Sequence, residues 1–147
     1  MSGIVAAIRG GPASKPTIKT AIDLAQETAL PLYFLYVVNL DFLTHTSSTR
    51  VQIISQEMHQ MGEFILLSAQ AEAASQAVTA EGVVRHGDVG EEIVKLSHEI
   101  GADYLVLGRP KLQQEESVFT QDRLHQFIAD TEEQTGAVVV LPEGEPS

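Results

Sequence analysis

The sequence predicts an α/β fold, a doubly wound parallel sheet of five strands, and two observations carry that prediction. Five short apolar runs alternate along the 147 residues with stretches in which apolar residues recur every three or four positions. Three of the runs are almost wholly apolar, which is typical of strands that helices cover on both faces. Each crossover is long enough to join parallel strands with the usual right hand. The runs span residues 3–8, 32–38, 77–85, 104–107 and 137–141.

Each of the first four runs is followed by a helical stretch. The first helix opens near Pro16, and the second and longest follows a Thr/Ser-rich loop at 44–49. The third begins at Asp88 and stops at Gly101. The Asp88 carboxylate can accept a hydrogen bond from a first-turn amide, while the Glu91 side chain can accept one from the Asp88 amide. The fourth ends before Gly136. The predicted inward faces are Ile18, Ala21, Ile22, Ala25 and Ala29; Val51, Ile54, Met58, Met61, Ile65 and Ala69; Ile93, Leu96, Ser97 and Ile100; and Leu124, Phe127, Ile128 and Thr131.

Composition excludes several classes of protein. Nine Lys+Arg against 20 Asp+Glu give a net charge of -11, so the surface repels nucleic-acid phosphates and anionic lipid headgroups. The absence of cysteine excludes disulfides and cysteine-based metal or redox sites. The length predicts a single domain, 1–142, followed by a short acidic tail, 143–147. A secretory signal peptide is not expected, because no basic residues precede the first apolar run. A membrane span is not expected either, because no apolar run nears the roughly 20 residues that it needs. We therefore expect a cytoplasmic protein.

The sequence offers little support for catalysis or for a metal centre. The five histidines are scattered without metal-ligand spacing, and the chain lacks a Gly-x-Ser-x-Gly elbow. Adjacent carboxylates fall in helices, where neighbours point apart. His86 is the exception to note, because it follows the third strand towards the carboxyl edge of the sheet, where a doubly wound fold binds its ligands; the alternative is an ordinary loop histidine. We therefore expect no catalytic residue, no metal and no cofactor.

Several segments resemble the universal stress protein (UspA-like) family. Ala-Ile-Arg-Gly at 7–10 stands where members carry Ala-Val-Asp-Gly, and Tyr-Val-Val at 36–38 matches the end of their second strand. The stretches 87–93 and 99–108 resemble the family's Gly-Asp-Pro-x-x-x-Ile helix and Gly-Ala-Asp-Leu-Ile-Val-Met-Gly strand, and 137–141 resembles its closing strand. The resemblance implies the flavodoxin-like (HUP-type) strand order 3-2-1-4-5 and a role in stress tolerance.

The resemblance also exposes a departure from the ATP-binding members. These carry Gly, two residues, Gly, nine residues, then Gly-Ser or Gly-Thr, so that backbone amides and a hydroxyl contact the phosphates. When the spacing is counted from Gly108, Lys111 occupies the position of the second glycine, and Gln121 and Asp122 occupy the positions of the Gly-Ser pair. No other glycine occurs between Gly108 and Gly136. Arg9 stands where ATP-binding members place an acidic residue. We expect no ATP binding in the family's usual manner.

Basic residues replace the missing glycine cradle. Arg9 follows the first strand, and Arg109 and Lys111 follow the fourth, at the predicted reversal of strand order. One interpretation is a sensor that binds a nucleotide or another small anion there, with Gly10, Val38 and Gly108 in the same site. The other is that Arg9 and Arg109 pair with Asp41, Asp88 or Asp122 and close the crevice.

The closing strand predicts how the chain assembles. In the family the corresponding strand commonly pairs antiparallel with its copy, so we expect a homodimer through Val138, Val139, Val140 and Leu141. The leading hypothesis is thus a dimeric regulatory or binding module of a stress response that is not an enzyme. The anion sensor is the alternative. A slow phosphate-ester hydrolase is a third hypothesis, for which the sequence supplies no base.

Overall fold

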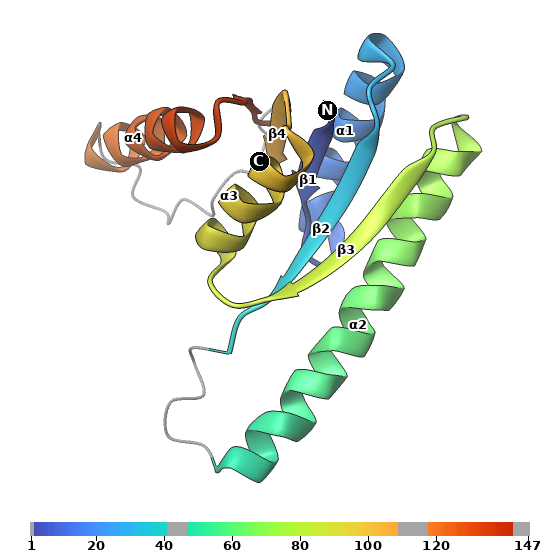
Figure 1. The fold of residues 1–147 in the computed structure, drawn as a ribbon, viewed down its shortest axis with the longest axis vertical. Helices are drawn as coiled ribbons and strands as arrows, with labels where there is room; N and C mark the ends of the chain where they lie inside the picture. The colour runs from blue at the N-terminus through green and yellow to red at the C-terminus, as the bar shows by residue number, and fades with distance from the viewer. Residues whose placement is uncertain (1, 41–46, 109–117, 143–147) are drawn as a thin grey trace.

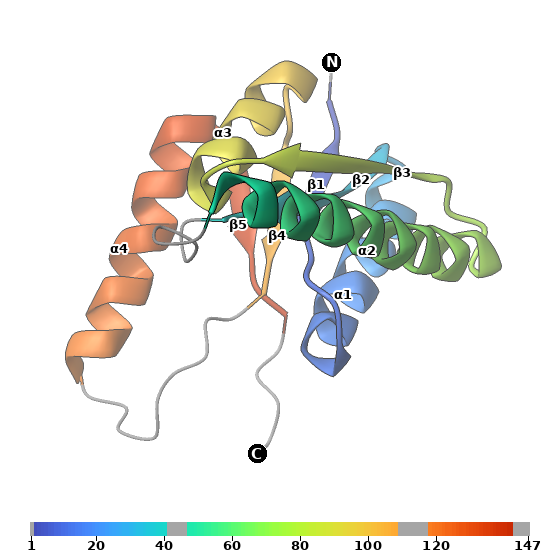
Figure 2. The same ribbon diagram turned by 90° about the horizontal axis from the view of Figure 1, so that it is seen from below.

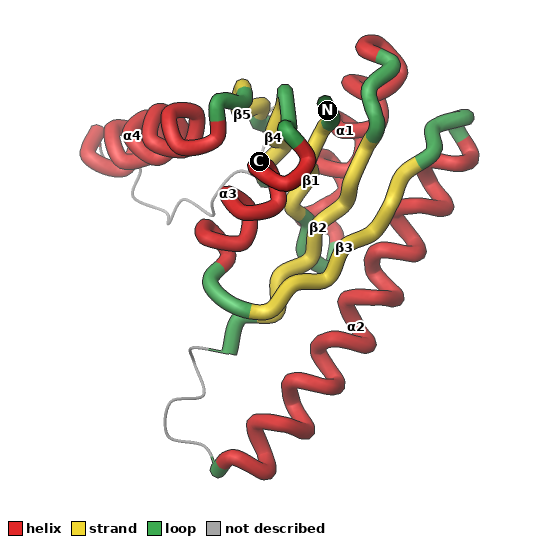
Figure 3. Tube along the Cα trace, viewed as in Figure 1, coloured by secondary structure: helices red, strands yellow, loops and turns green. Residues whose placement is uncertain are grey.

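A computed structural model of the chain describes residues 2–40, 47–108 and 118–142, with the backbone alone at 13 and 118–125. Strands and helices alternate along the chain, as Figure 1 and Figure 3 show. In chain order the elements are β1 (Ile4–Ala7), the 3-10 turn η1 (Pro12–Ser14), α1 (Lys15–Thr28), β2 (Leu32–Val38), α2 (Ser48–Ser75), β3 (Ala80–His86), α3 (Val89–Ile100), β4 (Tyr104–Leu107), α4 (Val118–Thr135) and β5 (Val138–Val140).

The five strands form one parallel sheet in the order β3-β2-β1-β4-β5, which confirms the predicted fold class and strand order. β1 lies at the centre, where Ile4 is in register with Leu32 on one side and Tyr104 on the other. The order of the strands reverses between β1 and β4. A doubly wound sheet binds its ligands outside the carboxyl ends of the strands at this point.

Helices cover both faces of the sheet, as Figure 2 shows from below. α1 and α2 pack on one face, and α3 packs on the other, beside α4. Each face buries its own apolar cluster, so the strands are apolar on both sides. The first cluster includes Ile18, Ile22, Phe34, Leu66 and Ala69. The second includes Val5, Leu35, Ile93, Leu96 and Leu105.

One residue of the predicted inward face of α2 points away from the sheet, whereas Ala69 is buried and Met58 and Ile65 pack half-buried against the core as predicted. Met61 was expected to point inward, but its side chain is 58% exposed, and the buried residues are Gly62, Leu66, Ala69 and Ala73. Gly62 explains the difference, because a Cβ atom there would lie 2.4 Å from Cδ1 of Tyr36. The helix therefore packs closely against Tyr36 of β2 at a residue without a side chain, and Met61 turns outward.

The third helix begins and ends where the sequence predicted, but among the described residues the Glu91 side chain makes no hydrogen bond back to the Asp88 amide. Asp88 is its N-cap, and the Asp88 carboxylate accepts a hydrogen bond from the Glu91 amide at 3.0 Å. Gly101 ends the helix in the left-handed conformation, with φ at 71°, which favours glycine. The predicted inward residues Ile93, Leu96, Ser97 and Ile100 are all buried.

Three other predictions need correction. Ala29 is exposed and forms the left-handed end of α1, with φ at 59°, so it does not belong to the inward face. The third strand starts at Ala80, because Ala77 occupies a left-handed turn with φ at 63°. Phe127 is 47% exposed on α4, although Thr131 on the same helix is buried as predicted.

Within the described part of the chain, no helix combines the length and apolarity that a membrane span requires.

Candidate functional site

The loop after β1 lies at the reversal point and carries the first predicted site residue. The side chain of Arg9 is exposed, while its backbone amide donates to Oγ of Ser14 at 2.8 Å. Ser14 is buried where η1 meets α1, so this hydrogen bond ties the loop to the start of the helix. The guanidinium of Arg9 is thereby carried on a loop whose main chain is fixed at both ends.

Two glycines shape this loop. A Cβ atom at Gly10 would lie 2.8 Å from Cδ1 of Ile65, so α2 closes directly over the loop at that residue. Gly11 has a φ of 92°, a conformation that residues with a side chain rarely adopt. The close approach of α2 thus depends on the glycine at position 10, and the turn that follows in the loop depends on the glycine at position 11.

Val38 ends β2, and Gly108 directly follows β4; these two strands lie on either side of β1. The side chain of Val38 is only 1% exposed and packs in the core, and its carbonyl accepts a hydrogen bond from the Gly87 amide at 3.0 Å. A Cβ atom at Gly108 would lie 3.3 Å from Oγ1 of the buried Thr17. Val38 therefore turns its side chain away from solvent, whereas Gly108 brings the chain close to α1.

Arg109 and Lys111, the other predicted basic residues, lie outside the described residues, as does Asp41, and only the backbone of Asp122 is described. Gly108 and Arg9 leave neighbouring strands, so the order that was predicted to bring these segments together is confirmed. Arg9 makes no ion pair with any described residue. Asp88, one of its predicted partners, is engaged instead as the cap of α3.

A second group of polar side chains lies at the carboxyl end of β3. Nδ1 of His59 on α2 is 2.8 Å from Nε2 of His86, and the two rings lie in nearly parallel planes, 20° apart. At that distance one ring nitrogen donates the proton and the other accepts it. Nε2 of His59 also lies 3.6 Å from a Glu63 oxygen. The pair lines an open groove of about 500 Å³ with Leu40, Val51 and Gln56 among its other residues.

The sequence pointed to His86 but gave no reason to join it to His59, because 27 residues separate the two and no motif has that spacing. Among the residues described, no group of three or more histidine, aspartate or glutamate side chains is arranged to hold a metal ion. The histidine pair thus links α2 to the end of β3, and its groove is separate from the loop that carries Arg9.

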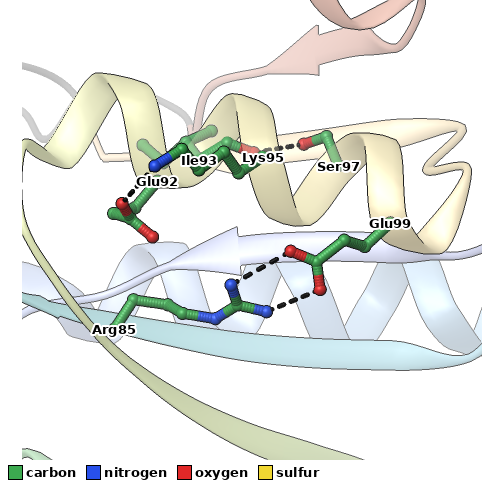
Figure 4. Close-up of polar contacts among 6 residues, drawn as sticks. All are labelled: Arg85, Glu92, Ile93, Lys95, Ser97 and Glu99. Carbon is green, nitrogen blue, oxygen red and sulfur yellow. Dashed lines mark hydrogen bonds and ion pairs between the residues drawn. The ribbon is translucent and has the colours of Figure 1, made fainter.

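Charged side chains also join β3 to α3 on the opposite face, as Figure 4 shows. Two guanidinium nitrogens of Arg85 donate to the two carboxylate oxygens of Glu99 at 3.0 and 2.7 Å. This hydrogen bonding lowers the pKa of Glu99 below its ordinary value and raises the pKa of Arg85. Nearby, the buried Glu92 accepts from Lys95 at 3.3 Å, so it is paired, while Ser97 donates to the Ile93 carbonyl.

Comparison with known proteins supplies a family. The model of the universal stress protein family matches residues 1–140. The chain belongs to the universal stress protein family. A curated relative, universal stress protein YxiE of Bacillus subtilis, is 27% identical over 113 residues, which cover 71% of this chain and 76% of that one.

Solved universal stress proteins share the fold of this family member. UspA from Lactobacillus plantarum matches with a TM-score of 0.75 at 16% identity, over 97% of both chains. A family protein from Arabidopsis thaliana, solved with AMP bound, matches with a TM-score of 0.63 at 15% identity, over 99% of this chain and 94% of that one. In this universal stress protein, Arg9, Gly10 and Gly108 lie at the reversal point of the shared sheet.

Proposed function

We propose that this universal stress protein is a regulatory or binding module of a stress response, acts in the cytoplasm without catalysing a reaction, and does not bind ATP in the family's usual manner. The sequence after β4 carries this proposal. Lys111, Gln121 and Asp122 stand at the positions of the glycines and hydroxyl that would contact the phosphates. A lysine or glutamine side chain fills the space that a glycine leaves for the backbone to approach a phosphate, and the carboxylate of Asp122 repels it.

An anion sensor at the same edge of the sheet is the second candidate. It is favoured by the exposed side chain of Arg9, which is unpaired among the described residues, and by the basic residues Arg109 and Lys111 that follow β4 in the sequence. The Arabidopsis family protein has AMP bound, so a nucleotide is one anion to test. A guanidinium fork would bind a phosphate or carboxylate through two hydrogen bonds.

Thermal unfolding with ATP, AMP, cyclic nucleotides, phosphate and acetate separates the two candidates. A ligand at 100 times its Kd adds about 2.7 kcal/mol of stability. For a chain of this size, that raises Tm by roughly 5–10 °C. The module without a nucleotide site predicts no shift with any of these ligands. The sensor predicts a shift that persists in moderate salt.

The sensor also predicts which arginine matters. Arg9→Ala should abolish the shift, whereas Arg50→Ala, the same change of charge at an exposed position at the start of α2, should leave it intact. A shift that both variants retain would show a ligand bound elsewhere and would remove the role of Arg9.

We also propose that the protein is a homodimer whose copies pair through Val138, Val139, Val140 and Leu141. β5 is the last strand of the described sheet, and Val138 is 53% exposed. An apolar edge strand left open is prone to pair with other chains, and pairing with a second copy removes that edge. Light scattering at micromolar concentration tests the dimer; a mass of one chain would contradict it.

A further inference from the structure

The short strand β5 has few backbone groups that face a partner strand. Val138 donates its amide to the Asp103 carbonyl of the neighbouring chain segment at 2.9 Å, and Val138 and Val140 are in register with Tyr104 and Val106 of β4. Because successive residues of a strand turn their N–H and C=O groups to opposite edges, Val139 alone of the three strand residues faces outward. An antiparallel copy of β5 would therefore depend on the amide of Val139.

Side chains of α4 already occupy this edge. The Val139 amide donates to Oε2 of Glu132 at 3.0 Å. The preceding outward amide, that of Ala137, donates to Oγ1 of Thr135 at 3.2 Å. A carboxylate is a stronger acceptor than the carbonyl oxygen that a partner strand would offer, because its hydrogen bond is charge-assisted. The amides of Ala137 and Val139, at the edge that the dimer would use, are thus already paired within one chain.

We propose that Glu132 is a gate on the β5 edge: it blocks strand pairing while it accepts from Val139, and a second copy of this chain pairs only when Glu132 withdraws. This inference rests on the proposed dimer and names the contact that regulates it. Two copies that meet at Val139 would also bring their Glu132 carboxylates together across the twofold axis. Like charges at a pairing edge disfavour association, as charged side chains do on other edge strands.

The second copy, and not an unrelated protein, is the occupant that the edge fits. The strand is three residues long and wholly valine, so its outward side presents one hydrogen-bonding residue with an exposed apolar neighbour, Val138. An identical strand run antiparallel matches this short, symmetric edge with itself. Pro142 follows closely in the sequence and cannot donate an amide hydrogen bond, which limits the pairing to the same few residues.

Sedimentation equilibrium of the full chain and four variants tests the gate. Glu132→Ala removes the acceptor and the charge, whereas Glu132→Gln removes the charge and keeps an acceptor oxygen. Glu133→Ala removes an equal charge from the adjacent, exposed position. Val139→Pro deletes the outward amide and spares the ladder with β4, since proline is tolerated on edge strands when its missing N–H faces outward. Thermal melts of each variant check that it is folded.

We expect Glu132→Ala to lower the Kd of the dimer by about tenfold or more, because it frees the Val139 amide. The expected Kd of Glu132→Gln lies between that value and the unsubstituted one, while Glu133→Ala stays unchanged and Val139→Pro is monomeric. If the unsubstituted protein and Glu132→Ala dimerise equally well, the gate is wrong and the dimer stands. If both remain monomeric at the highest concentration, the dimer itself is wrong. An equal effect of Glu133→Ala would show that net charge, not the contact with Val139, controls association.

Discussion

Replacing Gly62 with alanine sets two energies of opposite sign against each other. In the interior of a helix, alanine is favoured over glycine by about 1 kcal/mol, so an unpacked α2 would gain stability. The added Cβ atom would lie 2.4, 2.8 and 3.1 Å from Cδ1, Cε1 and Cγ of Tyr36, whereas carbon atoms in contact prefer about 3.5–4.0 Å. Tyr36 is buried in the centre of β2, so its ring has little room to retreat.

The steric cost should exceed the helical gain. Overpacking a core costs about 1–3 kcal/mol, and three contacts this short with Tyr36 place the cost in the upper part of that range. After the helical gain of about 1 kcal/mol is subtracted, we expect Gly62→Ala to lower the free energy of unfolding by about 1–2 kcal/mol. Urea denaturation measures the change, and Gly90→Ala on α3 is the matched control. The nearest atom to a Cβ there is a carboxylate oxygen of Asp88 at 3.4 Å, so this variant should be neutral or slightly more stable.

A double-mutant cycle locates the cause of the loss. In a Tyr36→Leu background the ring is absent, and Gly62→Ala should then lose most of its penalty. If Gly62→Ala is as stable as the unsubstituted protein, or if its penalty survives in the Tyr36→Leu background, the close approach of α2 to β2 at Gly62 is wrong.

Three further predictions concern contacts at the ends of strands and helices. Asp88→Ala removes the N-cap of α3 and should cost about 1 kcal/mol in chemical denaturation; an unchanged midpoint would contradict the cap. Hydrogen bonding from Arg85 lowers the pKa of Glu99 in the folded protein below the value of about 4.3 expected in the unfolded chain. Glu99 therefore stabilises the fold above about pH 4.3, and this stabilisation is lost as the pH falls through the lower pKa of the folded state. Glu99→Gln should therefore be less stable than the unsubstituted protein at neutral pH and equal to it in strong acid, and an equal gap at both would refute the pairing. His86→Ala should speed amide hydrogen exchange in residues 51–60 of α2, whereas His98→Ala, on the exposed side of α3, should not; equal exchange in both would argue against the histidine contact.

Periodicity predicted the sheet well because its central strands are buried on both faces. The bounds of β2 and β4 were predicted to the residue, since both are continuous apolar runs that end at polar or glycine residues. Ala77 was mistaken for strand because alanine is apolar, yet it adopts a left-handed turn that favours glycine or asparagine. The predicted face of α2 failed at Met61 for a related reason: glycine has no hydrophobicity, so the pattern gives no sign that Gly62 packs inward.

The candidate site could be predicted only in part. The sequence placed Arg9 and Gly108 at the reversal point, because strand order and motif both fix where β1 and β4 end. It could not show that Ile65 closes over Gly10, that His59 meets His86, or that Glu132 occupies the amide of Val139. These contacts join side chains from different elements, and none has a characteristic spacing along the chain.

Isothermal titration of the purified protein with ATP tests the central claim most directly. At about 1 mM ATP, a site with a Kd of about 10 µM would be almost fully occupied. We predict no saturable heat for the unsubstituted chain, and saturable binding for the triple variant Lys111→Gly, Gln121→Gly, Asp122→Ser, which restores the family's spacing from Gly108. Stoichiometric ATP binding by the unsubstituted chain would contradict the account.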